Sequence, residues 1–237
     1  MLEKVTLPSY TKGEEIFNGI SHGVGILFAI FATVFYSVHA DEAHELAGAL
    51  VFTLSAMFLY LSSTLYHAIT KENIKKVFRL IDHSVIFIMI TGTVTALNII
   101  TIYPVNKFLS TLGTVVSLVV TITGIILTFL DQERFKNLQM ILYVAISCIP
   151  IFGAKTLFDT NESAFLITVL LAVGGVVYGI GMVLYIISKK KNIKYLNCFK
   201  NSGLWLQQVT ARSLIPARSV GAAWVPYGPG PEKAAEW

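Results

Sequence analysis

Six long hydrophobic runs dominate the sequence, and short polar segments separate them. Each run has about the twenty residues that an α-helix needs, at about 1.5 Å per residue, to cross about 30 Å of hydrocarbon. Continuous runs of this length favour helices over the alternating strands of a membrane barrel. The pattern therefore predicts an all-α, polytopic helical membrane bundle. Its expected spans cover approximately residues 17–38, 45–69, 80–102, 107–130, 137–157 and 164–188.

Composition agrees with a membrane protein. The 237 residues are 54% hydrophobic and only 14% charged, and the mean hydropathy is +0.68. A chain this apolar is unlike a soluble domain, and it is too long for a single span. The net charge of +4 does not indicate a nucleic-acid partner, because the basic residues fall in short clusters between the apolar runs.

The basic clusters predict the orientation of the bundle. The second and fourth connections and the segment after the sixth run are basic, whereas the first, third and fifth connections are nearly free of Lys and Arg. Basic connections stay on the cytoplasmic side, so both ends of the six-span unit are expected in the cytoplasm. The clusters consist of Lys71, Lys75, Lys76 and Arg79, then Arg134 and Lys136, then Lys189, Lys190, Lys191 and Lys194.

Side chains capable of chemistry flank the second connection. Ser63 and His67 lie four residues apart near the end of the second run, so a helix places them about 40° apart on one face. Asp82 opens the third run, after a loop expected to have roughly ten residues. Since the two runs are joined on one side of the membrane, His67 and Asp82 are expected at similar depth.

The start of the first run adds polar groups to the same layer. Glu15, Asn18 and His22 have i, i+3, i+7 spacing, which keeps them within roughly a 60° arc of one helix face. Ionisable groups at the bilayer centre cost about 2.5–3.5 kcal/mol, and less near the interface, so they usually face the bundle interior and a partner. Three helices therefore contribute to one candidate site.

Purely structural roles remain open for each of these residues. Ser63 can bond back to a carbonyl of its own helix, and His67 can be an interfacial histidine with satisfied hydrogen bonds. Glu15 and Asp82 can cap helix starts, where the helix dipole favours acidic groups. Their coincidence at one depth favours a shared site over four separate structural roles.

Three segments resemble the hemolysin III family of bacterial inner-membrane proteins, which is related to the progestin and adipoQ receptors. They are EEIFNGISHG at the first run, SSTLYH at the end of the second and LIDHS at the start of the third. The resemblance covers roughly residues 14–195. It implies a seven-helix bundle of the adiponectin-receptor type in the bacterial cytoplasmic membrane, with the amino terminus in the cytoplasm.

The resemblance also implies zinc bound near the cytoplasmic side. In the receptor branch, the histidine of a Ser-x-x-x-His on the second helix and both histidines of a His-x-x-x-His on the seventh hold the ion, and an aspartate lies close by. Ser63, His67 and Asp82 match the first and last of these elements. Ceramide-cleaving hydrolases in the wider superfamily imply a zinc-activated water attacking a lipid amide, with Asp82 as general base and Ser63 in a supporting role.

The carboxyl-terminal part departs from the family pattern. No histidine follows His83, so the seventh-helix pair is missing. Residues 1–200 contain thirteen lysines and two arginines, whereas residues 201–237 contain one lysine and two arginines and are rich in Gly, Ala and Pro. This change indicates a shifted reading frame, a fusion or a rearranged gene. The expected organisation is a cytoplasmic segment (1–16), a bundle (17–195) and an atypical tail (196–237) expected to be disordered or non-native.

Three functions remain as alternatives. The first is a metal-dependent lipid amide hydrolase. It is expected to be impaired because His67 is the single matched histidine, unless His22, Glu15 or Asp82 substitutes as a zinc ligand or a partner chain contributes one. The second is a membrane-perturbing, haemolytic protein, and the third is a non-catalytic regulator of membrane state. Membrane lipids are the expected partners in all three. Loss of the seventh helix leaves faces uncovered, so homo-oligomerisation is also expected.

Overall fold

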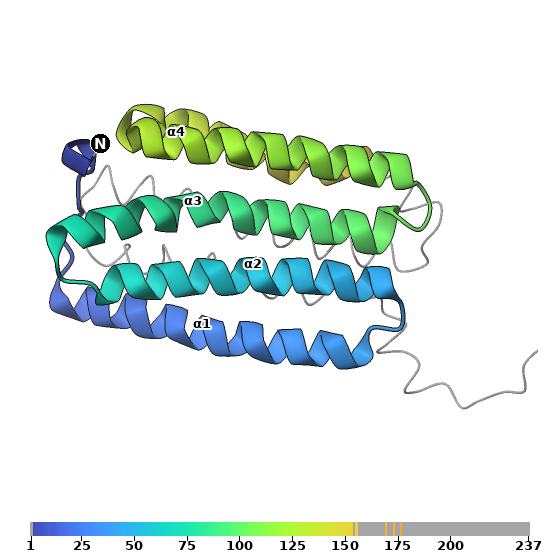
Figure 1. Ribbon diagram of the computed structural model, residues 1–237, viewed down its shortest axis with the longest axis horizontal. Helices are drawn as coiled ribbons and strands as arrows, with labels where there is room; N and C mark the ends of the chain where they lie inside the picture. The colour runs from blue at the N-terminus through green and yellow to red at the C-terminus, as the bar shows by residue number, and fades with distance from the viewer. Residues whose placement is uncertain (1, 154, 156–168, 170–172, 174–175, 177–237) are drawn as a thin grey trace, which may run out of the picture.

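The structure is a bundle of long, antiparallel helices. The computed structural model describes residues 2–153 together with residues 155, 169, 173 and 176. Within this part, the chain contains helices and turns but no strand, and successive helices lie side by side (Figure 1). The all-α prediction is confirmed. The elements are η1 (Leu2–Lys4), α1 (Lys12–His39), α2 (Ala43–Ala68), α3 (Glu72–Leu97), η2 (Asn98–Ile102), α4 (Lys107–Cys148) and η3 (Ile149–Gly153).

Helix α4 is a hairpin of two limbs. Its helical geometry breaks at Asp131, whose φ of −166° and ψ of 91° are extended. A Cβ on Gly113 would lie 3.3 Å from Ile149 Cγ2, whereas a straight helix would separate these residues by about 54 Å. The Asp131 carboxylate caps the second limb by accepting a hydrogen bond from the Arg134 backbone N–H at 3.1 Å. The limbs, 107–130 and 132–148, correspond to the fourth and fifth predicted spans.

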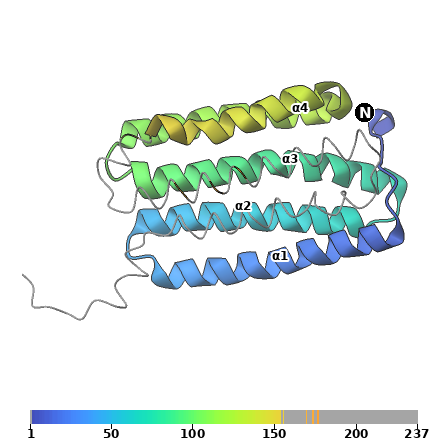
Figure 2. The ribbon, with the colours of Figure 1, turned by 180° about the vertical axis from the view of Figure 1, so that it is seen from behind.

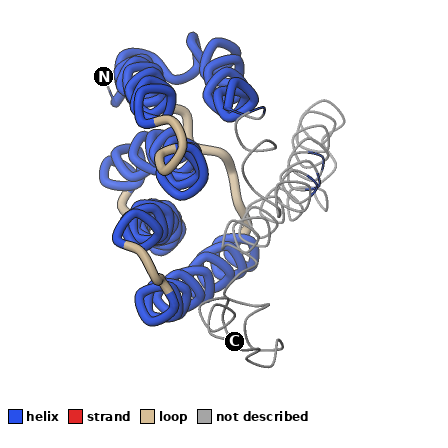
Figure 3. The backbone as a smooth tube through the Cα atoms, turned by 90° about the vertical axis from the view of Figure 1, so that its right-hand side faces the viewer, coloured by secondary structure: helices blue, strands red, loops and turns tan. Residues whose placement is uncertain are grey.

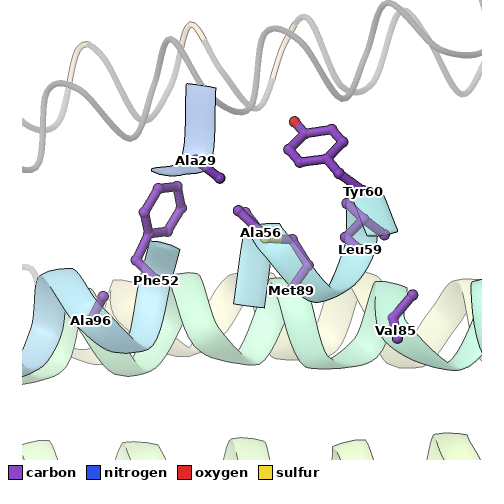
Figure 4. Packing of buried hydrophobic residues seen from close by; sticks show 8 residues of the cluster. All are labelled: Ala29, Phe52, Ala56, Leu59, Tyr60, Val85, Met89 and Ala96. Carbon is purple, nitrogen blue, oxygen red and sulfur yellow. The ribbon is translucent and has the colours of Figure 1, made fainter. Parts of the chain in front are cut away.

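Close helix contacts set the register between α2 and α3. Gly92 lies against Ser55, and a Cβ on Gly48 would lie 2.6 Å from Ile100 Cγ1, so only a hydrogen fits at each glycine. This antiparallel register places Asp82 level with the turn from Ser63 to His67. The core nearby draws on three helices (Figure 4). Its members are Ala29, Phe52, Ala56, Leu59, Tyr60, Val85, Met89 and Ala96.

Large apolar side chains cover the outside of the bundle. Four helices of the described part are long and apolar enough to cross a membrane, the fourth being the two-limbed α4 with its continuation to Gly153. In the end-on view, the helices follow one another around a curve (Figure 3). An apolar exterior is what a lipid environment requires. On α1 alone the exposed residues include Ile16, Phe17, Ile20, Leu27, Phe31, Val34 and Val38.

The second connection is shorter than the sequence predicted. It consists of residues 69–71, and α3 begins at Glu72, eight residues before the apolar run. The prediction of a roughly ten-residue loop is therefore wrong. Glu, Lys and Arg are good helix formers, and a Glu72–Lys76 ion pair of 2.7 Å supports the added turns. Asp82 consequently lies about 15 Å inside α3 and does not cap its start.

Helix α1 also begins before its apolar run. Thr11 and Glu14 form a capping box, in which the Thr11 hydroxyl accepts from the Glu14 backbone N–H and the Glu14 carboxylate accepts from the Thr11 N–H. Glu15 therefore lies in the first helical turn. Apart from residues 169, 173 and 176, the sixth predicted span lies outside the described residues, as do the lysine cluster after it and the expected tail (196–237).

Candidate functional site

One end of the bundle gathers the amino-terminal segment, the second connection and the turn of α4. Lys4 forms an ion pair with Asp131 at 3.2 Å, and the Thr6 hydroxyl donates to Glu133 at 3.1 Å. Arg79 on α3 approaches the same Glu133, with an N–O distance of 3.9 Å. Both ribbon views show the amino terminus beside this end of α4 (Figure 2). The basic connections thus share one end of the bundle.

Glu15 is the centre of the polar contacts at this end. Its Oε2 lies 2.6 Å from His67 Nδ1, and its Oε1 lies 2.7 Å from Lys75 Nζ. Lys75 also donates to the Ile69 carbonyl at 3.2 Å, which ties the second connection to α1. The side chains of His67 and Lys75 are only 6% and 12% exposed. The three charged or titratable groups therefore form one compact, largely buried unit.

The Glu15 contact fixes the tautomer of His67. A carboxylate accepts hydrogen bonds, so Nδ1 carries the hydrogen and Nε2 carries the lone pair of the neutral ring. This is the arrangement by which carboxylates commonly orient metal-binding histidines. Glu15 is thus placed as an orienting group for His67, whereas the sequence suggested it as a substitute ligand.

Aromatic rings enclose His67. His22 stacks on it with a centroid distance of 6.2 Å and an interplanar angle of 7°. Tyr10 and Tyr66 meet it edge-on, at 5.5 Å and 4.8 Å. Lys75 Nζ lies 5.1 Å from the centre of the Tyr66 ring, within the range of a cation–π contact. The spacing of Glu15, Asn18 and His22 on one face agrees with this inward placement, since Asn18 and His22 are buried.

Asp82 lies close enough to Tyr10, which contacts His67, to influence it electrostatically. Burial raises the pKa of the Tyr10 phenol, and Tyr66, Asp82 and Glu15 act in the same direction, whereas Arg79 opposes them. Ser63 is buried on α2, one turn before His67. The structure therefore brings Glu15, His22, Ser63, His67 and Asp82 to one end of the bundle, as the sequence predicted.

The described residues do not provide a complete zinc site. Among them, no three His, Cys, Asp or Glu side chains are grouped closely enough to hold a metal ion. The rings of His22 and His67 stack on each other, and Glu15 contacts Nδ1 of His67. A catalytic zinc normally has three protein ligands. The sequence contains no histidine after His83, so the further histidine pair that the resemblance implies is missing from this chain.

The hydropathy pattern alone does not place two residues of the site. Tyr10 belongs to a polar segment before the first apolar run, and Lys75 belongs to a basic cluster of a kind that usually lies in solvent. Both face inward because α1 and α3 extend beyond their apolar runs and bring their first turns together over His67. The sequence feature that could have indicated the ion pair is the acidic Glu15 at the start of one span together with the basic Lys75 shortly before another.

Comparisons with known proteins identify relatives of this chain. The family model described as Haemolysin-III related matches residues 10–202. The "Hemolysin-3 homolog" of Bacillus subtilis (strain 168) is 33% identical over 186 residues, which cover 76% of this chain and 84% of that protein. "Hemolysin-3" of Bacillus cereus is 31% identical over 195 residues, covering 80% and 85%. No solved structure matches the chain. The match over most of its length shows that the chain belongs to the Haemolysin-III related family.

Proposed function

We propose that this family member carries the remnant of a zinc site at the end of the bundle formed by the second connection and the turn of α4. His67 is the proposed ligand, Glu15 is proposed to orient it, and Asp82, which influences the neighbouring Tyr10 electrostatically, is the proposed general base. The observation that carries the proposal is the 2.6 Å contact between Glu15 and His67 in a largely buried setting. Burial of an imidazole oriented by a carboxylate is typical of metal and proton-transfer sites.

Hydrolysis of a lipid amide is the chemistry that the family resemblance implies for such a site. In this chain the described donor set falls short of three ligands, and no histidine follows His83. We therefore propose weak zinc binding and little or no hydrolase activity. Membrane lipids remain the proposed partners, because the exterior of α1 presents large apolar side chains to its surroundings.

Elemental analysis of the purified protein tests the zinc proposal. We expect well under one zinc per chain after dialysis, and we expect His67→Ala to lower zinc affinity by at least about tenfold, since it removes the ligand itself. His83→Ala is the matched control: His83 lies near the same end, where its Nδ1 contacts the Arg79 carbonyl at 3.0 Å. This variant should retain the zinc affinity of the unmodified chain.

A gain-of-function experiment completes the test. Grafting a seventh span with His-x-x-x-His should raise the zinc content toward one per chain, and His67→Ala in the grafted protein should abolish it. Stoichiometric, tightly held zinc in the unmodified chain would contradict the remnant site and implicate His22 or Glu15 as ligands. Equal zinc content in the chain and its His67→Ala variant would remove His67 from the proposal.

Membrane perturbation is the second candidate function. It rests on the names of the two relatives, "Hemolysin-3" and its homolog. Release of a dye from vesicles on addition of the purified protein distinguishes it from the zinc proposal. Leakage that persists in the His67→Ala variant would favour membrane perturbation, because that activity does not depend on the site.

We further propose that the end carrying the site faces the cytoplasm of a bacterial cell, in the cytoplasmic membrane. The alternation of basic connections supports this orientation. Cysteines placed singly at Asp41 and Lys75, in a chain whose Cys148 and Cys198 are replaced by serine, test it. Asp41 lies in the connection before α2, and Lys75 lies in the first turn of α3, at the opposite end of the bundle. A membrane-impermeant thiol reagent added to intact cells should label the Asp41→Cys protein and leave the Lys75→Cys protein unlabelled. Labelling at position 75 would reverse the orientation.

A further inference from the structure

The first ten described residues form a strap across the end of the bundle. From η1 beside the turn of α4, the chain passes the ends of α3 and α2 before it enters α1 (Figures 1 and 2). We call residues 2–11 the N-terminal strap. It passes over the end of the bundle that holds His67, so its contacts affect the access of water and solutes to that site.

The outer half of the strap is held by exposed polar contacts. Lys4 pairs with Asp131 at 3.2 Å, and its side chain is 64% exposed. Thr6 donates to the carboxylate of Glu133 at 3.1 Å, also at the surface. Exposed ion pairs and hydrogen bonds of this kind contribute little to stability. These polar contacts therefore add little to the free energy that holds the strap in place.

The inner half contacts the site itself. The Tyr10 ring meets the His67 ring edge-on at 5.5 Å, and Val5, between Lys4 and Thr6, adds a buried apolar contact with 6% exposure. Directly after Tyr10, the capping box of Thr11 and Glu14 fixes where α1 begins. Tyr10 thus lies at the junction between the strap and α1, and the residues before it are held by the surface contacts of Lys4 and Thr6 and by the buried side chain of Val5.

We propose that the N-terminal strap is a removable cover of the His67 site, with Tyr10 as the group that closes it. When the outer contacts release, the strap moves away with α1 as its fixed end, and a water-soluble molecule reaches the layer of Ser63 and His67. The cover acts on access alone, so the proposal is independent of whether zinc binds.

Thiol accessibility tests the cover in the full-length chain. A Ser63→Cys reporter is introduced with Cys148 and Cys198 replaced by serine, and the protein is placed in lipid nanodiscs. A small charged methanethiosulfonate then labels the thiol at a rate that follows the open fraction. We expect this parent protein to be labelled slowly. The Tyr10→Ala variant should be labelled about tenfold faster, because it lacks the ring that covers the site. The double variant Lys4→Ala and Thr6→Ala should be labelled about threefold faster, because it lacks the polar contacts of the outer half.

Matched controls separate opening from general damage. Tyr10→Phe keeps the ring and should label as slowly as the parent, and Tyr103→Ala, at the opposite end of the bundle, should leave the rate unchanged. A reporter at exposed Asn73 should label equally fast in every variant. If Tyr10→Ala fails to fold, as judged by its circular dichroism melting curve, the surface variant of Lys4 and Thr6 decides the question.

Two results would overturn the proposal. One is fast labelling of the Ser63→Cys thiol in the parent, which would mean that the strap covers nothing. The other is an unchanged slow rate in the Lys4 and Thr6 variant together with an unchanged rate in any folded Tyr10→Ala protein, which would mean that access does not depend on the strap.

Discussion

Replacement of Phe87 by alanine is expected to lower the free energy of unfolding by about 3 kcal/mol. Phe87 has no exposed surface, and the centroid of its ring lies 4.2 Å from the centroid of the Tyr143 ring. It also packs directly on Gly124, where a Cβ would collide with the Phe87 ring. It thus joins α3 to both limbs of α4. In a bilayer, the cost comes mainly from lost van der Waals contacts and the cavity, because lipid is as apolar as the core.

Phe108→Ala is the matched control for Phe87. The Phe108 side chain is 77% exposed at the start of α4, so its removal leaves no cavity and should leave the midpoint of unfolding nearly unchanged. Thermal unfolding in detergent or titration with a denaturing detergent measures both variants. Equal losses would mean that Phe87 is not a packing centre and that the two limbs of α4 do not close on α3 as described.

The fold was predictable because bilayer thickness dictates the length of an apolar run. The run 107–130 matches the first limb of α4, the run 80–102 ends with η2 at Ile102, and the break between the fourth and fifth runs falls at Asp131. The helix ends were not predictable by this route. Hydropathy identifies the residues that are stable in lipid. Glu72 and Lys76 extend α3 outside the lipid because both have high helix propensity and because they form an ion pair with each other.

For the site residues, the sequence predicted the depth in the membrane and the helix face on which each residue lies. Short connections place the end of one helix beside the start of the next, which brings His67 and Asp82 to one layer, and helical spacing aims Glu15 and His22 the same way. The specific side-chain contacts that each residue makes were not predictable. The approach of Lys75 to Glu15 depends on the extra turns of α3 and on the register set at Gly92, and these are tertiary features.

Replacement of Glu15 by alanine is expected to cost about 2 kcal/mol of unfolding free energy. Its carboxylate neutralises Lys75 and holds His67, whose side chains are 12% and 6% exposed. Breaking a fully buried pair costs about 3–5 kcal/mol. The Glu15 side chain is 21% exposed, so solvent screening reduces the expected loss. Glu15→Gln keeps the shape and a hydrogen-bond acceptor and should lose less.

Glu72→Ala supplies the matched control, because Glu72 forms an ion pair of the same 2.7 Å with Lys76 while its side chain is 71% exposed. Its loss should not change stability measurably. A double-mutant cycle then isolates the Glu15–His67 contact. Since the two residues touch, the effects of Glu15→Ala and His67→Ala should fall short of additivity by at least about 0.5 kcal/mol. Additive effects would show that Glu15 acts through Lys75 alone, and the orienting role assigned to it at His67 would then be wrong.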